Sequence, residues 1–461
     1  MSKKEPLSNI DTAWLRMDHP TNLMMITGVM MFAEPIPYER FKTTLEERFL
    51  RFDRFRQCVR DRSGTPYWED DLYFDIENHV HRVALPAPGD QRALQEYVSD
   101  LMGQSLDFSK PLWDMHLVEN YGEGCAVITR IHHCIADGMA LVRVLLEMTD
   151  ETRKGRRRSP RREDEHPGPV TKLLKPAENL FRTTLRATEA VLQEGMNLVF
   201  SPSHLLARAR QGLDLASVVA KLLLQGSDSD TILKGELGVR KRAAWSQPVP
   251  LPVVKNIGKK MGGTINDVLL TAVAGALRRY LEAHDQPLDD VEIRAIVPVN
   301  LRPLDEPITL GNKFGLVFLT LPVFLEDPLE RLREVHRRME AIKGSMEAVV
   351  ALGVLHGIGM APKEIEKLVI KLFSKMGSAV MTNVPGPRKQ LYFAGSPLTH
   401  IMFWVPRAGS VALGVSILSY NGEVLLGFAT DTHVVPDPNL LTDAFHEEFD
   451  ALTARFDEVG T

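Results

Sequence analysis

The sequence predicts an α+β fold in which strands and helices alternate irregularly. Short apolar segments typical of buried strands occur in both halves of the chain. Longer segments with apolar residues at helical spacing separate them. The two kinds of segment do not follow the regular strand–helix–strand order of a doubly wound parallel sheet, so α+β sandwiches fit the pattern better.

The first half of the chain contains three predicted strands. Residues 23–32 form an apolar run that predicts a buried strand, and residues 38–51 have helical apolar spacing. Residues 112–118 alternate apolar and polar positions, as a half-buried strand does. A third strand is expected from residue 125, leading into a turn at Asp137-Gly138 and an amphipathic helix over residues 139–148.

The middle of the chain has the composition of a linker. Residues 153–162 are basic and contain Gly and Pro, and residues 170–224 then have a helical pattern. With 461 residues the chain is long for a single core. We therefore expect an N-terminal domain over residues 1–152, a basic linker and helical connector over 153–248, and a C-terminal domain over 249–461.

The second half again mixes both kinds of element. Helices are expected at residues 253–260, from Thr264 onward, at 331–348 and after Asp437-Pro438. Strand-like segments cover residues 293–299 and 310–324. Between two further apolar runs, Asn421-Gly422 predicts a tight hairpin turn, because these residues tolerate positive φ.

The most informative segment is His132-His133-Cys134-Ile135-Ala136-Asp137-Gly138, which follows a predicted strand. Adjacent strand residues point to opposite faces, so only one of the two histidines can face a given cavity. A neutral imidazole can accept a proton from a hydroxyl group, which makes one histidine a candidate general base. Alternatively, both are core residues or metal ligands. Their position at a strand end, beside an acidic residue and a glycine, favours catalysis.

Several other chemistries lack their motifs. The sequence contains no Gly-x-Ser-x-Gly elbow and no phosphate-binding or dinucleotide-binding glycine loop. Metal binding by His132 and His133 is disfavoured, because the two side chains diverge and no third ligand lies nearby in sequence. The sequence therefore gives no reason to expect a metal or a cofactor.

Composition restricts the partners and the compartment. A net charge of −5 provides no global attraction for nucleic acid. The three cysteines are scattered without Cys-x-x-Cys spacing, as is typical of a reducing compartment. The start of the sequence does not resemble a signal peptide, and no long apolar run predicts a membrane span. We expect a cytoplasmic protein that can associate peripherally with a membrane.

The chain also resembles one acyltransferase family over nearly its whole length. His-His-x-x-x-Asp-Gly is the signature of the superfamily that includes chloramphenicol acetyltransferase and the condensation domains of peptide synthetases. Further motifs resemble, in order and spacing, the bacterial wax ester synthase/acyl-CoA:diacylglycerol acyltransferases. They are Leu7-Ser8-Asn9-Ile10-Asp11, Pro111-Leu112-Trp113, Asn266-Asp267-Val268, Pro298-Val299-Asn300-Leu301-Arg302 and Thr382-Asn383-Val384-Pro385-Gly386-Pro387. His132 and Asp137 also fit the His-x-x-x-x-Asp motif of membrane-bound glycerolipid acyltransferases, but the chain shares no other motif with those proteins.

This resemblance implies two chloramphenicol-acetyltransferase-like αβ sandwich domains joined by the helical linker, with the active site in a tunnel between them. It implies transfer of a long fatty acyl group from acyl-CoA to diacylglycerol, to a long-chain alcohol, or to both. His133 would accept the proton of the acceptor hydroxyl as the oxygen attacks the thioester. The imidazolium would then protonate the leaving coenzyme A thiolate, without a covalent intermediate.

The motif residues receive roles on the same basis. His132 and Gly138 complete the catalytic motif, with the His132 ring facing away from the substrate. Asp137 is expected to orient the loop through an ion pair with Arg56, since related folds pair this aspartate with an arginine. Trp113 is expected either in the acyl pocket or in the hydrophobic core.

Four residues of the second half are further candidates. Asn266 could donate a hydrogen bond to the developing oxyanion, or Asn266 and Asp267 could cap the helix that follows. Thr382 and Asn383 are expected to shape the far side of the tunnel, or to form a rigid turn.

The expected partners are acyl-CoA, a lipid alcohol, and a membrane or lipid-droplet surface. The basic cluster at residues 153–162 could bind anionic headgroups, and the helical segment at 170–200 could add an apolar face. A solvated linker is an equally good interpretation of that cluster. Two other functions stay open: a condensation-type domain that uses carrier-bound thioesters, and a lipid-binding scaffold without catalysis.

Overall fold

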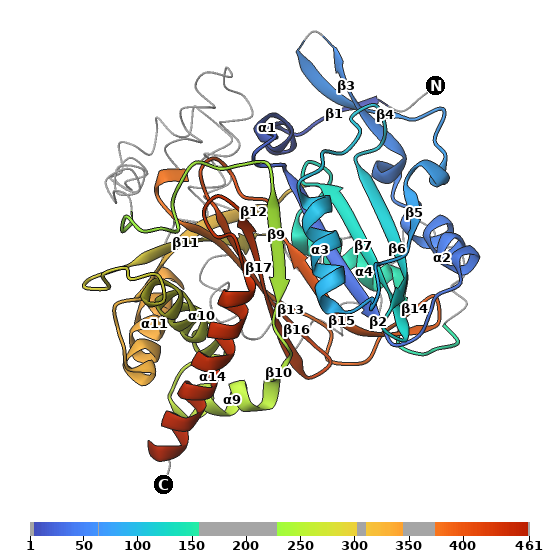
Figure 1. Ribbon diagram of the computed structural model, residues 1–461. Coiled ribbons are helices and arrows are strands. Elements are labelled where there is room, and N and C mark those ends of the chain that lie inside the picture. The colour runs from blue at the N-terminus through green and yellow to red at the C-terminus, as the bar shows by residue number, and fades with distance from the viewer. Residues whose placement is uncertain (1–3, 63, 156–227, 302–309, 344–373, 460–461) are drawn as a thin grey trace, which may run out of the picture.

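The computed structural model describes residues 4–62, 64–155, 228–301, 310–343 and 374–459. Within these ranges the chain forms two seven-stranded sheets side by side, with a three-stranded sheet beyond the first (Figure 1). The predicted α+β class is confirmed. The expected basic linker after residue 155 and the helical segments at residues 170–224 lie outside the described residues.

The first sheet has the strand order β5-β6-β7-β2-β15-β14-β8. Two of its strands, β15 and β14, come from the last part of the chain, and β15 pairs antiparallel with β2. The two halves therefore interleave across the boundary expected at residue 249. The strands are β5 (Val80–Val83), β6 (Trp113–Tyr121), β7 (Gly124–His132), β2 (Met25–Phe32), β15 (Ser396–Trp404), β14 (Tyr392–Phe393) and β8 (Thr149–Asp150).

The second sheet has the order β10-β17-β16-β13-β11-β12, with β9 also paired to β17. The hairpin between β16 and β17 turns at Asn421 (φ 49°) and Gly422 (φ 89°), as predicted for this dipeptide. The strands are β10 (Val249–Pro250), β17 (Glu423–Asp431), β16 (Leu413–Tyr420), β13 (Ala379–Pro385), β11 (Ile293–Asn300), β12 (Phe314–Leu321) and β9 (Lys241–Trp245). The small third sheet contains β1 (Lys4–Pro6), β4 (Thr65–Asp70) and β3 (Gln57–Arg62).

Helices cover both faces of the first sheet. α3 packs with β9 on one face, and α4 packs on the other (Figure 1). The expected helix at residues 38–51 is an α-helix that continues as a π-helical turn. The elements of this half are α1 (Asn9–Met17), α2 (Tyr38–Thr44), η1 (Leu45–Phe49), η2 (Asp53–Arg56), η3 (Ile76–Asn78), α3 (Gln91–Met102) and α4 (Gly138–Met148).

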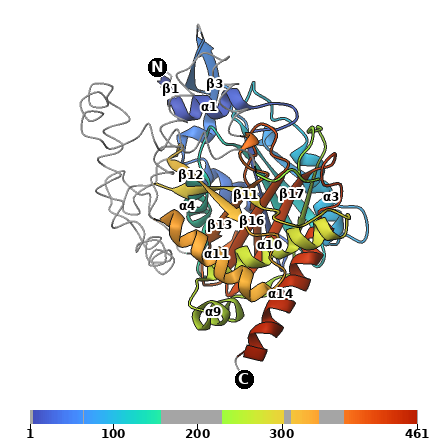
Figure 2. The same ribbon diagram turned by 90° about the vertical axis from the view of Figure 1, so that its left-hand side faces the viewer.

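Four helices lie together on one face of the second sheet: α9 (Leu251–Lys260), α10 (Ile265–Glu282), α11 (Pro328–Lys343) and α14 (Asn439–Val459) (Figure 2). α10 begins with a capping box, in which the Thr264 and Asp267 side chains each accept a hydrogen bond from the other residue's backbone N–H.

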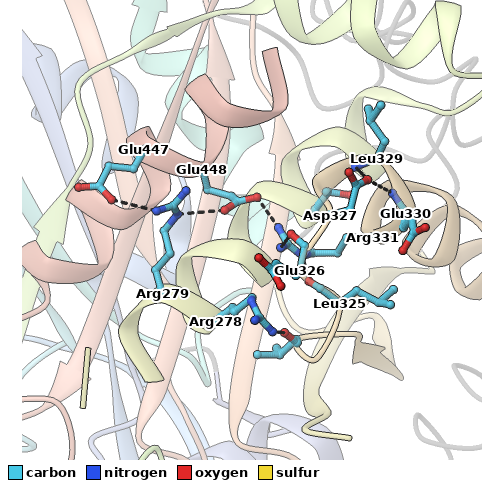
Figure 3. Close-up of polar contacts among 12 residues, drawn as sticks. Arg278, Arg279, Leu325, Glu326, Asp327, Leu329, Glu330, Arg331, Glu447 and Glu448 are labelled. Atoms are coloured by element: carbon cyan, nitrogen blue, oxygen red, sulfur yellow. Dashed lines mark hydrogen bonds and ion pairs between the residues drawn. The ribbon is translucent and has the colours of Figure 1, made fainter. Parts of the chain in front are cut away.

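A buried ion pair joins three of these helices (Figure 3). Glu448 of α14 accepts hydrogen bonds from Arg331 of α11 and from Arg279 of α10. The side chains of Arg331 and Glu448 are only 1% and 5% exposed. Gly275 of α10 lies directly beneath, and a Cβ there would collide with Glu448. This network links α10, α11 and α14 within the helical layer on the second sheet.

Candidate active site

The His-His-x-x-x-Asp-Gly segment lies at the end of β7, where it turns into α4. His132 is the last residue of β7, and Asp137 is the N-cap of α4, accepting a hydrogen bond from the N–H of Ala140 (2.8 Å). Between them the His133 N–H donates to the carbonyl of Met24 (2.7 Å), which ties the turn to the start of β2. The local structure is the strand, turn and helix that the sequence predicts.

His133 lies at the boundary between the two halves. Its ring stacks on the indole of Trp14 from α1, with centroids 4.1 Å apart, and Phe314 of β12 lies 5.6 Å away. His133 is 4% exposed and lines a cavity formed by both halves. Its Nδ1 is buried without a hydrogen-bond partner among the described residues.

Burial lowers the pKa of His133 to about 4, against opposing contributions from the nearby carboxylate of Asp137 and from the backbone carbonyl of His133 itself. The imidazole is consequently neutral at physiological pH. A neutral ring can accept a proton, which is what a general base requires. The conjugate acid, once formed in this apolar site, is a strong proton donor.

His132 occupies a different environment. Its Nδ1 accepts a hydrogen bond from the N–H of Cys134 (3.2 Å), and its ring packs edge-on against Phe108. The Nε2 atom lies 3.7 Å from the carboxylate of Asp18. His132 is 1% exposed and does not line the cavity that His133 lines. The structure thus places the two imidazoles in separate surroundings and gives His132 a supporting position.

Asp137 connects the catalytic turn to the second half of the chain. Besides capping α4, its carboxylate accepts a hydrogen bond from the N–H of Lys313 (2.9 Å). The Gly311 N–H donates to the carbonyl of Ile135 (2.9 Å), and the Asn312 side chain donates to the carbonyl of His133 (2.7 Å). Gly311 has φ 106°, a conformation that glycine adopts without strain. We call these contacts between the turn and residues 311–313 the clasp.

Two sequence-based assignments are wrong. Arg56 is not the partner of Asp137: its side chain is 48% exposed and donates to Asp53 (2.6 Å), whereas Asp137 is buried. The resemblance in position to an arginine of related folds pointed to the wrong residue, because Arg56 lies at the protein surface. Trp113 is not a substrate contact. It is 1% exposed, donates to the carbonyl of Phe55 (2.8 Å), and belongs to the core, as the alternative prediction had it.

Of the four candidate residues from the second half, two line the cavity and two do not. Thr382 and Asn383, on β13, line the cavity across from the first half. Asn266 does not line it; its side-chain oxygen accepts a hydrogen bond from Asn383 (2.8 Å) and so orients that amide. Asp267 forms the capping box of α10 and pairs with His336 (2.8 Å), which makes its role structural. The capping alternative for this motif is thus the one that the geometry supports.

The cavity itself is mostly apolar and has a volume of about 150 Å³. The first half contributes Trp14, His133, Asp137 and Gly138, and the second half contributes strands β11, β12, β13 and β15. Polar side chains from the second half are few among the lining residues that the structure describes. They are Asn300, Ser374, Thr382 and Asn383.

Sequence reasoning missed two features of this site. The indole of Trp14 packs against the ring of His133, although its helix is far from the motif in sequence. The only signal for this contact in the sequence is an apolar side chain in the N-terminal motif region. The second is the N-terminus of α4. The N–H groups of Gly138 and Met139 have no intrahelical acceptor, and both residues line the cavity. An aspartate N-cap followed by glycine is the sequence signal for such a donor pair.

One group of potential metal ligands occurs among the described residues, formed by His81, Asp114 and His116. The Asp114 carboxylate is bound by Arg130 (Nε–O 2.9 Å), and Tyr97 bonds the Nδ1 of His116 (2.8 Å). These ligand candidates do not line the catalytic cavity.

Fold and site together define an acyltransferase of the His-His-x-x-x-Asp-Gly type. Residues 7–269 match the wax ester synthase/diacylglycerol acyltransferase catalytic domain, and residues 310–453 match the C-terminal domain of the same proteins. The chain belongs to the wax ester synthase/diacylglycerol acyltransferase family.

Individual relatives match this chain along nearly its full length. A probable diacylglycerol O-acyltransferase of Mycobacterium tuberculosis is 29% identical over 97% of this chain and 96% of its own. The O-acyltransferase WSD of Acinetobacter baylyi is 26% identical over 99% of both chains. The wax ester synthase/diacylglycerol acyltransferase of Marinobacter aquaeolei VT8 superposes with a TM-score of 0.70 at 22% identity, covering 98% of this chain and 99% of that one. A starter condensation domain of rhizomide synthetase shares the fold, with a TM-score of 0.60 at 14% identity over 98% and 94% of the two chains.

The low pKa of His133 predicts an unusual pH dependence. The folded protein binds this proton only near pH 4, whereas an unfolded histidine binds it near 6.5. The catalytic neutral form therefore persists as the pH falls, and kcat/KM should stay level from pH 7 to below 6. Over the same window the unfolded state takes up the proton first, so burial of neutral His133 costs about 1 kcal/mol of stability at pH 5.5.

The matched control is His133→Gln, which keeps a polar side chain but cannot titrate. Thermal unfolding of both proteins at pH 7.5 and pH 5.5 measures the difference, and the wild type should lose more stability on acidification. A kcat/KM profile that falls with a midpoint near pH 6.5 would contradict the assignment of His133 as a buried neutral base.

The clasp predicts that Asp137 matters for stability and activity together. Asp137→Ala removes the cap of α4 and leaves the Lys313 N–H without this acceptor, which should cost about 2 kcal/mol of unfolding free energy. Asp137→Asn keeps an oxygen that can accept one of the two bonds, so it should cost less. Chemical denaturation with parallel rate measurements tests this. If Asp137→Ala unfolds like the wild type but has no activity, the carboxylate acts in the chemistry itself.

Proposed function

We propose that this protein transfers a long-chain fatty acyl group from acyl-CoA to the hydroxyl of diacylglycerol, of a long-chain alcohol, or of both. The products are triacylglycerol and wax ester. The observation that carries the proposal is a neutral, buried histidine, His133, at the edge of an apolar cavity between the two halves. The names of the full-length relatives, diacylglycerol O-acyltransferase and wax ester synthase, support the substrate classes.

The mechanism follows from the position of the base. Nε2 of His133 takes the proton of the acceptor hydroxyl while the oxygen attacks the thioester carbonyl. The tetrahedral intermediate collapses by breaking the carbon–sulfur bond. The imidazolium then returns the proton to the coenzyme A thiolate, so the protein ends in its starting state. Stacking on Trp14 holds the ring in place throughout.

The oxyanion of the tetrahedral intermediate needs hydrogen-bond donors. The N–H groups of Gly138 and Met139, at the N-terminus of α4, are suited to this role. Both residues line the cavity, and the N-terminus is the positive end of the helix dipole. Asn383, oriented by Asn266, offers an amide from the opposite wall. We assign oxyanion binding to the N-terminus of α4, because Asp137 of the catalytic turn is the N-cap of this helix and holds it beside His133.

The first test separates the two histidines. His133→Ala should reduce thiol release from palmitoyl-CoA by about a hundredfold to ten-thousandfold with either diacylglycerol or hexadecanol as acceptor. His132→Ala should reduce it less, and mainly through stability, since its ring supports the turn. Purified protein, free-thiol detection and chromatography of the lipid product provide the measurement. Near wild-type turnover in His133→Ala would refute the mechanism, and turnover only with a carrier-bound thioester would indicate a condensation-type enzyme.

We further propose that the enzyme works at a membrane or lipid-droplet surface, because its substrates partition into lipid. Among the helices that the structure describes, none is long and apolar enough to cross a bilayer. Docking is assigned to the basic cluster at residues 153–162, of which the structure describes the first three residues.

Vesicle binding tests the docking proposal. The wild type should co-sediment with anionic liposomes at low salt and be released at high salt, because screening weakens headgroup attraction. A variant with serine at the seven basic positions of residues 153–162 should stay in solution. Neutral phosphatidylcholine liposomes are the control. Equal binding by both proteins would remove the basic cluster from the docking surface and leave the chemistry at His133 unaffected.

A further inference from the structure

The three potential metal ligands His81, Asp114 and His116 lie together on one face of the first sheet. Asp114 and His116 are two residues apart on β6, so their side chains point to the same face. β5 runs parallel to β6 and pairs His81 with His116, which places the two imidazole rings side by side, with centroids 4.8 Å apart. β5 ends the strand order of this sheet, so His81 is exposed at its edge, while the side chains of Asp114 and His116 are 13% and 8% exposed (Figure 1).

The spacing of the ligand atoms fits a small metal ion. Nε2 of His116 lies 3.3 Å from Oδ1 of Asp114. Two ligand atoms at 2.0–2.2 Å from a tetrahedral zinc ion are about 3.3–3.6 Å apart, so these two atoms already have the spacing of a ligand pair. The three ligand atoms together lie within 4.8 Å of one another. The third ligand belongs to the exposed side chain of His81, which can rotate to the shorter spacing.

His116 has the hydrogen-bonding pattern of a metal-bound histidine. Its Nε2 is buried without a hydrogen-bond partner among the described residues, whereas buried polar atoms nearly always have one. Its other ring nitrogen, Nδ1, lies 2.8 Å from the hydroxyl of Tyr97 on α3. A metal-bound histidine typically donates its second ring N–H to a polar partner, which fixes the tautomer and the ring orientation. The Tyr97 oxygen can accept that hydrogen bond and leave the Nε2 lone pair directed at the metal.

The surroundings of Asp114 restrict which ion can bind. Arg130 of β7 donates to both carboxylate oxygens of Asp114 and so holds the carboxylate in place. A carboxylate offers about four lone-pair sites, so sites remain for a metal. The charges of Arg130 and Asp114 cancel, which leaves two imidazole nitrogens and one oxygen in a site without net charge. Ca²⁺ and Mg²⁺ need several oxygen ligands, whereas imidazole suits Zn²⁺, Cu²⁺ and Ni²⁺.

We propose that His81, Asp114 and His116 bind one late first-row divalent metal ion of the Zn²⁺ type, and that this ion has a structural role. It joins the edge strand β5 to β6, and the Asp114–Arg130 pair extends the connection to β7, which ends at His132. None of the three ligands lines the catalytic cavity, so the ion lies outside the site of acyl transfer. The inference is independent of the function proposed above.

Titration of the tag-free, chelator-treated protein with ZnCl₂ is the first test. Calorimetry should show one Zn²⁺ per chain, and the melting temperature should rise by about 3 °C at a hundredfold excess over Kd. MgCl₂ is the control ion and should cause no rise. The rate of acyl transfer at 25 °C should be the same with and without Zn²⁺, while inactivation on heating should be slower with it.

His81→Ala removes one ligand and should abolish both the calorimetric signal and the rise in melting temperature. Because His81 is exposed, this variant should melt like the metal-free wild type. His400→Ala is the matched control, since His400 is also a partly exposed histidine on an edge-facing position of a strand in the same sheet. It should bind Zn²⁺ as the wild type does.

Tyr97→Phe keeps all three ligands and removes only the hydrogen-bond partner of Nδ1. It should weaken Zn²⁺ binding by about tenfold to a hundredfold without changing the stoichiometry. Electron paramagnetic resonance of the Cu²⁺-loaded protein identifies the ligands directly. The wild type should show coupling to two imidazole nitrogens, and His81→Ala to one. Asp114 is left intact in these variants, because its removal would strand the buried Arg130.

Three results would overturn the proposal. The first is the absence of Zn²⁺ binding by the wild type at micromolar concentrations. The second is equal Zn²⁺ binding by the wild type and His81→Ala, which would place the ion at another group of residues. The third is an unchanged Zn²⁺ affinity in Tyr97→Phe together with a Cu²⁺ spectrum that His81→Ala does not alter.

Discussion

The clasp between the catalytic turn and residues 311–313 is the contact on which the active site depends. The turn belongs to the first half and the clasping residues to the second. Asp137 caps α4 and accepts from Lys313, while Asn312 holds the carbonyl of His133. The same few hydrogen bonds thus fix His133, the N-terminus of α4 that lines the cavity, and the alignment of the two halves around it.

Apolar burial serves the chemistry in two ways. Under the proposed function, the apolar walls that lower the pKa of His133 would also accommodate the hydrocarbon chains of the substrates, so one property of the cavity would supply both the protonation state and the substrate preference. A base with a low pKa is weak, yet its conjugate acid is correspondingly strong. Direct transfer needs both steps from one side chain, and the surroundings of His133 favour the return of the proton to the leaving thiolate.

Local patterns in the sequence predicted the local structure well. The strand, turn and helix around His133, the Asn421-Gly422 hairpin and the cap at Thr264 each depend on residues that are neighbours in sequence. Contacts between distant segments could not be predicted this way. Nothing in the sequence around Asp137 indicates that its carboxylate accepts a hydrogen bond from Lys313, and the resemblance to related folds points to Arg56 instead. Trp113 and Trp14 are equally apolar in sequence, and only the packing decides which one meets His133.

The insertion of β15 into the first sheet affects how the chain folds as it is made. β2 (Met25–Phe32) pairs with β15 (Ser396–Trp404), so β2 leaves the ribosome several hundred residues before its partner. At ordinary elongation rates that partner arrives on the order of tens of seconds later. Until then β2 presents an open backbone edge, which is a template for pairing with other chains. Nascent chains of this protein should therefore depend on chaperones until β15 is made, and truncation before β15 should expose the first sheet to aggregation.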